Sequence, residues 1–382
     1  MEQPVVYIEG DGIGPFIMEA TLFAVDSVVR AVYSDKRIEW KEALAGQKAL
    51  ENKGTPLPEE TLEAIRKAGV AIKGPLATPV GTGYRSLNVQ IRQQLDLYAC
   101  IRPVKWLKGT PSVVKNPELL DVVIFRENTE DVYAGIEWKV GSSEAKRVRS
   151  FLWESFNINL SEDTGIGIKP ISERASKRLM RSAMRYAIEN GRRAVTIVHK
   201  GNIMKFTEGA FRNWCYEVAR SEFREHVRLE EESEAEDGKI LVNDRITDDM
   251  FQQVLLFPQR YDVIVTTNLN GDYLSDACAA QVGGIGVTPS ANVGDTCAVF
   301  EPTHGTAPRL KNPKYANPLS LMLSAAMMLE HIGWNEAASA LRNAAENVVE
   351  KGVATPDLAE KMGKSGVTAM DFARVVIEEA KR

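Results

Sequence analysis

Arginines cluster in the first third of the chain, next to segments expected to form buried strands. Arg92 and Arg102 flank an apolar stretch, and Arg126 directly follows the apolar run Val122–Phe125. Open α/β sheets bind ligands at the carboxyl ends of their strands, and a buried guanidinium is costly unless a carboxylate or phosphate neutralises it. Taken singly, each arginine is more often a surface or salt-bridge residue. Together the three indicate a site for an anion.

Two aspartates four residues apart, Asp272 and Asp276, follow the apolar run Val263–Val265. On a helix, this spacing places both carboxylates on one face, where two hard oxygen ligands suit Mg²⁺ or Mn²⁺. Taken alone, the pattern is explained more simply by one aspartate that caps a helix and a second that is solvated.

A third strand end, after Val195–Val198, carries His199 and Lys200. A lysine placed beside other cations has its ammonium form disfavoured, and this suits it to carrying a proton. We expect His199 to be a hydrogen-bonded structural residue rather than a base.

Two glycine-containing loops are candidates for binding a cofactor. In Gly10–Pro15 the third glycine of a GxGxxG motif is replaced by Pro15, so a tight turn between a strand and a helix is the favoured interpretation. In Glu301–Arg309, the Gly-Thr-Ala-Pro turn lets the backbone approach a ligand closely, and Arg309 is available for a phosphate.

The segments that must position these residues alternate between short apolar runs and stretches of helical period. Buried strands are predicted at Val5–Ile8, Val70–Ile72, Val122–Phe125, Val195–Val198 and Val263–Val265. A helix that Asn190 and Gly191 close is predicted from apolar residues recurring every four positions, at Ala175, Leu179, Ala183 and Ala187. This alternation predicts an α/β architecture with a largely parallel sheet.

The composition excludes several classes of protein. A chain of 382 residues is expected to form two domains, and a net charge near −5 offers no general attraction to nucleic acid or anionic membranes. The four cysteines lack CxxC spacing, so we expect neither a zinc site nor disulfides, and we expect a cytoplasmic location. The chain has no long apolar run, so no membrane span or signal peptide is expected. The acidic run 230–237 is interpreted as a solvated loop.

Four longer motifs carry a family resemblance: Arg85–Asn88, Arg126–Gly135, His199–Lys205 and Asn268–Asp272. With these motifs in this order, the chain resembles the isocitrate and isopropylmalate dehydrogenase family over nearly its whole length, and most closely its prokaryotic homodimeric isocitrate-oxidising members. The resemblance implies that family's α/β fold, which is not a Rossmann fold. It implies a large, coenzyme-side domain in residues 1–97 plus 283–382, a small domain in 98–282, and a dimer clasp in about residues 131–172.

The resemblance also implies roles for individual residues. By similarity, Ser86 and Asn88 bind the γ-carboxylate of isocitrate, and the other carboxylates are held by Arg92, Arg102 and Arg126. The implied metal ligands are Asp272 and Asp276 from one subunit and Asp248 from the other. Tyr133 is similar to the family's proton donor, and Lys200 to the lysine that reaches across the homodimer. The residues expected on the coenzyme side are Thr78, His304, Gly305, Thr306, Ala307, Arg309 and Asn317.

The implied activity is the Mg²⁺- or Mn²⁺-dependent oxidative decarboxylation of isocitrate to 2-oxoglutarate and CO₂, a step of the tricarboxylic acid cycle. Ser86 and Asn88 favour isocitrate because they offer hydrogen bonds where an isopropyl group would need apolar contacts. A homoisocitrate or isopropylmalate dehydrogenase and a catalytically silent regulatory subunit are the alternatives. Arg309 and Lys311 favour NADP, whereas Thr355–Leu358 is similar to the NAD-using members, so NADP is preferred with NAD left open.

Overall fold

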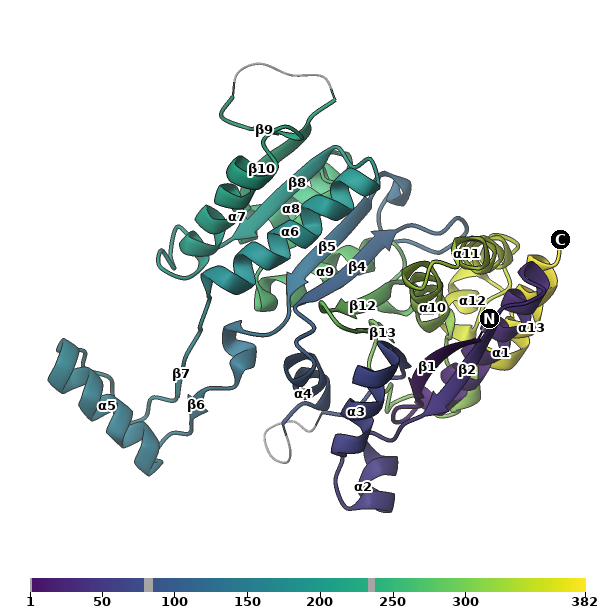
Figure 1. Ribbon diagram of the computed structural model, residues 1–382, viewed down its shortest axis with the longest axis horizontal. Coiled ribbons are helices and arrows are strands. Elements are labelled where there is room, and N and C mark those ends of the chain that lie inside the picture. Colours follow the sequence, from purple (N-terminus) through teal and green to yellow (C-terminus); the bar gives the residue numbers. More distant parts are fainter. Residues whose placement is uncertain (1, 79–84, 233–237) are drawn as a thin grey trace.

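The computed structural model describes residues 2–78, 85–232 and 238–382, and most of their strands form one large sheet (Figure 1). The strands of this sheet in the described residues are β1 (Glu2–Ile8), β2 (Arg37–Glu42), β3 (Val70–Lys73), β4 (Ala99–Lys105), β5 (Asp121–Glu127), β8 (Ala194–His199), β9 (Val227–Leu229), β10 (Ile240–Ile246), β11 (Val263–Thr266), β12 (Pro289–Val293) and β13 (Ala298–Pro302). Their spatial order is β2-β1-β3-β13-β12-β4-β5-β11-β8-β10-β9.

The sheet is largely parallel, as the sequence predicts. β12 runs antiparallel to both β13 and β4, and β4 runs antiparallel to β5, whereas the other neighbouring pairs are parallel. All five predicted strands are present, as β1, β3, β5, β8 and β11. They read as unbroken apolar runs because strands of a covered parallel sheet are buried on both faces.

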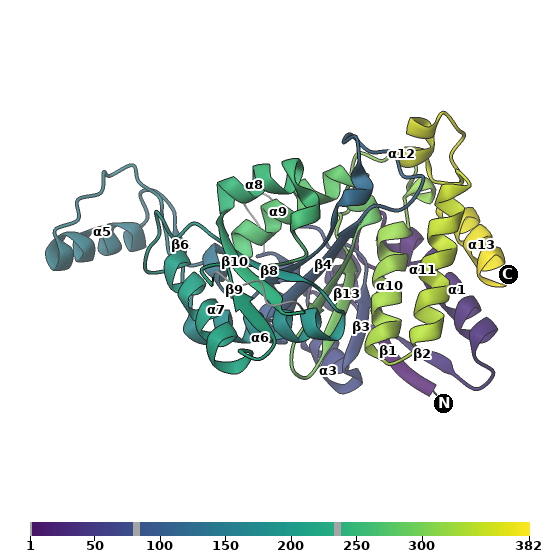
Figure 2. The same ribbon diagram turned by 90° about the horizontal axis from the view of Figure 1, so that it is seen from above.

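Helices cover both faces of the sheet: α1 (Gly14–Val32), α2 (Gln47–Lys53), α3 (Glu59–Ala68), α4 (Leu87–Gln94), α6 (Glu173–Glu189), α7 (Glu208–Glu222), α8 (Thr247–Leu256), α9 (Asn268–Gln281), α10 (Leu319–His331), α11 (Asn335–Glu350), α12 (Pro356–Ala359) and α13 (Ala369–Ala380). Figure 2 shows α6 and α7 on one face of the sheet and α8 and α9 on the other. The predicted helix is α6: all four of its predicted apolar residues are buried, Ser172 caps its first turn, and the left-handed Gly191 follows its end.

The apolar core is divided among three clusters of buried side chains. The largest joins α1, α10, α11 and α13 to the sheet, the second lies between α6, α7 and strands β5, β8, β10 and β11, and the third places α3 and α4 against β1 and β3. One continuous sheet therefore runs through both predicted domains. The predicted boundaries at 97/98 and 282/283 fall between α4 and β4 and just after α9, and the division stays a prediction.

A projecting arm occupies the region predicted as a clasp. It consists of the two-stranded antiparallel ribbon β6 (Glu137–Trp138) and β7 (Ile166–Gly167) and the helix α5 (Ser143–Phe156), which extends away from the body (Figure 1). Within α5 only Ala145 is buried, and large apolar side chains are more than half exposed at Phe151, Trp153 and Phe156.

The structure also bears on the membrane-spanning helices, the cysteines and the acidic run that the composition raises. In the described residues no helix is long and apolar enough to cross a membrane. All four cysteines are buried and unpaired with one another, as their spacing predicts. Of the acidic run, residues 233–237 lie outside the described part; Glu230 pairs with Arg245.

Candidate active site

A cavity of about 200 Å³ lies where α4, α9, the end of β5 and the loop after β13 meet, and we call it the substrate cavity. Its lining includes nine of the predicted site residues: Ser86, Asn88, Arg92, Arg102, Arg126, Tyr133, Asp272, His304 and Gly305. The structure thus brings together side chains that are more than 200 positions apart in the sequence.

The three predicted arginines enter the substrate cavity from three elements. Arg92 comes from α4, Arg102 from β4 and Arg126 from β5, and each is less than a tenth exposed. Nitrogen atoms of all three, Arg92 Nε, Arg102 Nε and Arg126 Nη2, are buried and have no hydrogen-bond partner among the described residues. Because a buried unpaired donor is costly, this arrangement suits a ligand that brings several anionic oxygens.

The two aspartates of the predicted metal site lie on α9. This helix begins at Asn268 after Thr267, so Asp272 is in its second turn and is not a helix cap. Asp272 and Asp276 approach the same guanidinium, with carboxylate oxygens 3.5 and 3.7 Å from Arg102 Nη1. The sequence argument for a shared face is therefore confirmed, and the alternative of a capping Asp272 is wrong.

Opposing effects set the ionisation of these two carboxyl groups. Burial raises the pKa of Asp272, but the charges of Arg126 and Arg102 and a hydrogen bond from Tyr133 together hold it below its ordinary value. For Asp276, burial dominates and raises the pKa, with a further contribution from the neighbouring charge of Asp272. Asp272 is consequently the carboxylate that stays ionised beside the arginines.

Tyr133 lies in the 3₁₀ turn Asp131–Ala134 that follows β5. Its hydroxyl donates a hydrogen bond to Asp272 Oδ2, and its ring lies 4.9 Å from the guanidinium carbon of Arg126. Burial raises the pKa of Tyr133 to about 12; Arg126 opposes the shift and Asp272 adds to it. The phenol is therefore protonated at neutral pH and available as a proton donor.

The start of α4 supplies the polar end of the substrate cavity. Ser86 caps this helix by accepting a hydrogen bond from Val89 N, and its Oγ also accepts one from Thr78 Oγ1 at 3.2 Å. Asn88 Oδ1 is buried without a partner in the described part of the chain. Thr78 is thus linked to the cavity through Ser86, although it does not line it.

Asp276 does not line the cavity although it lies beside Arg102, and the predicted Lys200 and Asp248 lie farther along other elements. These two follow β8 and begin α8, and they form an ion pair with each other. Neither lines the substrate cavity, and the Asp248 side chain is 71% exposed. His199, next to Lys200, is buried and hydrogen-bonded to Asp244 and Gly201, which confirms its structural interpretation.

Apart from Thr78, the predicted coenzyme residues lie between β13 and α10. His304 and Gly305 reach the cavity, where burial lowers the pKa of His304. The carbonyl of Thr306 accepts a hydrogen bond from Ile13 N and lies so close to Gly12 that a side chain there would collide with it. The N-terminal glycine segment is therefore a tight turn packed against this loop, as its sequence favours. Farther along, Ala307 has a left-handed backbone and Arg309 is exposed, while Asn317 donates a hydrogen bond to Asp357.

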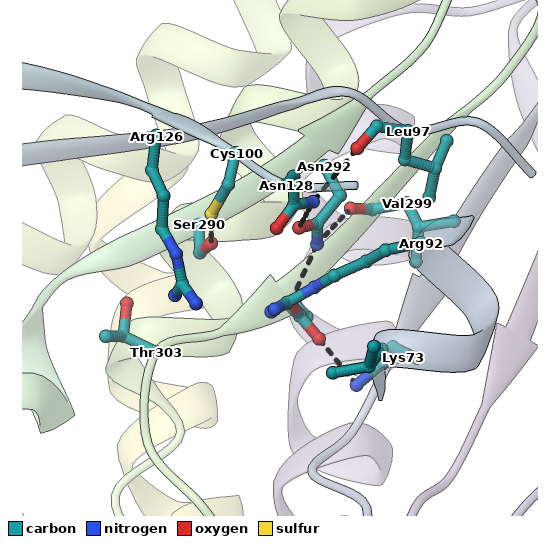
Figure 3. Close-up of polar contacts among 12 residues, drawn as sticks. Lys73, Arg92, Leu97, Cys100, Arg126, Asn128, Ser290, Asn292, Val299 and Thr303 are labelled. Carbon is teal, nitrogen blue, oxygen red and sulfur yellow. Dashed lines mark hydrogen bonds and ion pairs between the residues drawn. The ribbon is translucent and has the colours of Figure 1, made fainter. Parts of the chain in front are cut away.

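Sequence reasoning missed a buried charged cluster beside the arginines. Lys73 Nζ lies 2.6 Å from Glu301, which also accepts hydrogen bonds from Arg92 at 2.8 Å and Asn292 at 2.7 Å. Figure 3 shows Lys73 and Arg92 reaching the same carboxylate. A signal was available, since both Lys73 and Glu301 interrupt apolar strand segments (Val70–Lys73 and Ala298–Pro302) that are buried throughout.

The fold and the site together define an α/β protein whose cavity is lined by buried guanidiniums, with a carboxylate and a phenol beside them, an arrangement suited to a small polyanion. The sequence signature of the isocitrate/isopropylmalate dehydrogenases matches residues 4–376. The chain belongs to this family.

Named relatives and solved structures agree with this assignment. The chain is 51% identical to an isocitrate dehydrogenase (NADP) of Archaeoglobus fulgidus, over 99% of this chain and 93% of that one. It is 50% identical to an isocitrate dehydrogenase (NADP) of Streptococcus salivarius, over 98% and 95%. The crystal structure of an isocitrate dehydrogenase from Methylococcus capsulatus superposes with a TM-score of 0.85 at 37% identity, covering all of both chains. The predicted family fold is thereby confirmed.

Proposed function

We propose that this chain catalyses the oxidative decarboxylation of isocitrate to 2-oxoglutarate and CO₂ with reduction of NADP⁺. The observation that carries the proposal is the set of three buried arginines with unpaired N–H groups in one cavity. Isocitrate has three carboxylates, and three guanidiniums offset their charge and fix their directions. The names of the relatives at about half identity point to the same reaction.

The polar end of the cavity favours isocitrate over isopropylmalate. Ser86 and Asn88 present hydroxyl and amide groups at the start of α4, and Asn88 Oδ1 lacks a partner among the described residues. An isopropyl group placed there would leave these groups unsatisfied, whereas a carboxylate can accept from the Ser86 hydroxyl and the Asn88 amide N–H, and the coenzyme carboxamide can donate to Asn88 Oδ1.

A divalent cation fits the carboxylates of α9. In the described residues of one chain no group of three acidic, histidine or cysteine side chains is placed to hold a metal ion. We infer that Asp272 and Asp276 supply two of the oxygen ligands. We infer that Asp248 of a second subunit completes the set, because this residue is exposed and outside the cavity in its own chain. Mg²⁺ or Mn²⁺ bound there would lower the pKa of the substrate hydroxyl and stabilise negative charge on its oxygen.

This chain's own groups account for positioning and for the final proton. The arginines hold the carboxylates while the substrate hydroxyl gives its proton to a base and hydride passes from the hydroxyl-bearing carbon to the nicotinamide; the β-carboxylate of the resulting keto acid then leaves as CO₂. Tyr133, protonated at neutral pH, returns a proton to the carbon that has lost CO₂. We infer that Lys200 of the partner subunit assists this transfer.

A homodimer follows from the same reasoning. Lys200 and Asp248 lie outside the cavity of their own chain, so a site containing them requires a second copy. The exposed apolar side chains of α5 would be covered if two projecting arms joined as a clasp. We also infer a large domain of residues 1–97 plus 283–382, a small domain of residues 98–282, and a location in the cytoplasm, where four free cysteines stay reduced.

NADP is the coenzyme that the exposed Arg309 favours, because a guanidinium pairs with the 2′-phosphate that distinguishes NADP from NAD. His304, Gly305, Thr306, Ala307 and Asn317 would line the coenzyme's path, with Thr78 near the nicotinamide end. Replacing Arg309 with Ala should raise the KM for NADP⁺ about tenfold and leave that for NAD⁺ unchanged. Lys314→Ala, in the same exposed loop, is the matched control.

Purified protein should be mixed with isocitrate, Mg²⁺ or Mn²⁺ and NADP⁺ or NAD⁺ while nicotinamide absorbance is followed. Metal-dependent reduction of NADP⁺ with release of CO₂ is the expected result. Turnover of isopropylmalate or homoisocitrate instead of isocitrate would contradict the assigned roles of Ser86 and Asn88. No turnover of any 2-hydroxy acid would leave the catalytically silent subunit as the better description.

A further inference from the structure

Three charged residues that are distant in sequence meet at the start of the turn that carries Tyr133, and we call them the Lys169 cluster. Lys169 Nζ lies 2.5 Å from Asp131 Oδ1 and 2.9 Å from Glu208 Oε1. Both carboxylate side chains are fully buried, and the lysine is 17% exposed. Burying two carboxylates around one ammonium is costly, so the arrangement demands a reason beyond stability.

Asp131 connects the turn that carries Tyr133 to the helix that carries Asp272. Its side chain accepts hydrogen bonds from Val132 N at 2.7 Å and from Leu269 N, in the first turn of α9, at 3.0 Å. Its own backbone is left-handed, with φ of +69°, and its N–H donates to the carbonyl of Pro170. Few non-glycine residues adopt this backbone, and aspartate is one of those that tolerate it, because its side chain can hydrogen-bond to the neighbouring backbone as it does here to Val132 N.

Glu208 connects the same helix to the segment that carries Lys200. Its Oε2 accepts hydrogen bonds from Lys200 N at 2.8 Å and Asn270 Nδ2 at 2.9 Å, and its Oε1 accepts one from Thr267 Oγ1 at 2.9 Å. The end of β8 and the start of α9 are thus fixed to one carboxylate.

Lys169 itself lies on the return segment of the projecting arm, directly after β7. This segment is hydrogen-bonded to the Tyr133 region at successive points: Ile168 N donates to Ile136 O, and Ser172 N donates to Glu130 Oε1. The lysine therefore brings the arm into contact with both buried carboxylates.

We propose that Lys169, Asp131 and Glu208 are positioning residues that hold Tyr133, Asp272 and Lys200 in a fixed mutual arrangement. This inference rests on the proposed function, in which a subunit uses its own Tyr133 and Asp272 but lends Lys200 to its partner. The Lys169 cluster then joins the parts that one subunit contributes to two active sites. Because Lys169 belongs to the arm, where the subunits are inferred to meet, a change in the position of the arm would affect both sites.

The first test replaces Lys169 with Met, which removes the charge and keeps the length of the side chain. We expect kcat with isocitrate to fall about 30-fold while KM changes less than about threefold, because the arginines that bind substrate do not touch the cluster. Lys169→Arg, which keeps the charge, should recover most of the loss. Lys177→Met is the matched control, since Lys177 also bridges two carboxylates and is 15% exposed, but it joins α6 to α7 away from the cavity.

Hybrid dimers separate the two connections. A dimer of one Tyr133→Phe subunit and one Lys200→Met subunit should retain a single intact site, built from the Tyr133 of the second subunit and the Lys200 of the first. Adding Lys169→Met to the Tyr133→Phe subunit should lower the activity of the dimer through Lys200. Adding it to the Lys200→Met subunit should lower that activity through Tyr133. Loss in only one of these hybrids would overturn the coupling.

The outcomes distinguish this inference from the proposed function. Wild-type protein that does not turn over isocitrate contradicts the function itself. Active wild type together with a folded Lys169→Met homodimer whose kcat is within twofold of the Lys177→Met control overturns the positioning role. If Lys169→Met does not fold, Glu208→Gln preserves the shape of the cluster and should show the same fall in kcat without a rise in KM.

Discussion

The substrate cavity and the Lys169 cluster are both buried and charged, but they differ in sign and in how fully their polar atoms are paired. Each carboxylate oxygen of Asp131 and Glu208 accepts at least one hydrogen bond. In the cavity, by contrast, three arginines retain nitrogen atoms without partners among the described residues.

We interpret this difference in pairing as the difference between a cavity that binds a ligand and a cluster that holds other residues in position. Unpaired buried donors raise the free energy of the unliganded protein, and they are satisfied when an anion enters. They therefore lower the stability of the free protein and increase its affinity for the anion. A saturated network does the reverse, because moving any of its members breaks several hydrogen bonds at once. Substitutions should accordingly affect activity most in the cavity and stability most in the cluster.

The largest expected effect is on catalysis, in the Arg126→Gln variant. Arg126 is fully buried and contacts Asp272, Asn268 and the Tyr133 ring. We expect kcat/KM for isocitrate to fall about 1000-fold, or about 4 kcal/mol, since the charge-assisted contact to substrate that we propose for Arg126 is lost. Steady-state kinetics at saturating metal measure this fall. Arg178→Gln, which breaks a bidentate pair with Asp96 outside the cavity, should stay within about threefold of wild type.

Gly271, on α9, tests whether activity depends on the exact position of Arg126. A Cβ atom on Gly271 would lie 2.6 Å from Arg126 Cγ, so Gly271→Ala must displace the arginine stem or the helix. We expect kcat/KM to fall about 30-fold by misplacement of the guanidinium and of Asp272. Gly209→Ala, on α7, meets only ordinary contacts of 3.5 Å or more and should leave kcat/KM near the wild-type value. Equal activity of the two variants would show that the cavity tolerates movement of α9.

For stability we expect the opposite order, in which a substitution in the Lys169 cluster costs more than one in the substrate cavity. Glu208→Gln should lower the free energy of unfolding by about 2–3 kcal/mol, because a buried carboxylate that is paired with Lys169 becomes neutral. Arg102→Met should cost about 1 kcal/mol or less, because it removes a buried charge that has an unpaired nitrogen. Thermal unfolding at one fixed protein concentration compares the two variants. A larger loss from Arg102→Met would reverse our distinction between binding and positioning.

The smallest expected effect is a dependence of stability on pH at Glu301. Burial opposes ionisation of this group, but Lys73 and Arg92 hold its pKa well below the ordinary value. Its contribution is therefore present above the unfolded pKa of about 4.3 and is lost as the pH falls toward the folded pKa. Wild type should exceed Glu301→Gln in Tm by a constant amount above about pH 5, and the difference should shrink on acidification. Glu60→Gln, at an exposed pair with Lys53, should show no such trend.

Much of the fold was readable from local pattern. The five apolar runs and the four-residue period of α6 correspond to observed elements, since burial on both faces of a parallel sheet and on one face of a helix imposes those patterns directly. β4, β12 and β13 were not predicted, because their runs are interrupted by residues such as Arg102, Asn292 and Glu301 that are buried with partners from other elements. The antiparallel part of the sheet was missed for that reason.

By itself, the sequence indicated which side chains could serve an anion and a cation, because Arg126 near the end of a strand and aspartates four apart on a helix follow from chain-local geometry. The tertiary structure alone decided which of them meet. It placed Arg92, Arg126 and Asp272 around one cavity and kept Lys200 and Asp248 out of it. It also joined Asp131, Lys169 and Glu208, because buried charges are stable only beside partners that folding brings from distant parts of the chain.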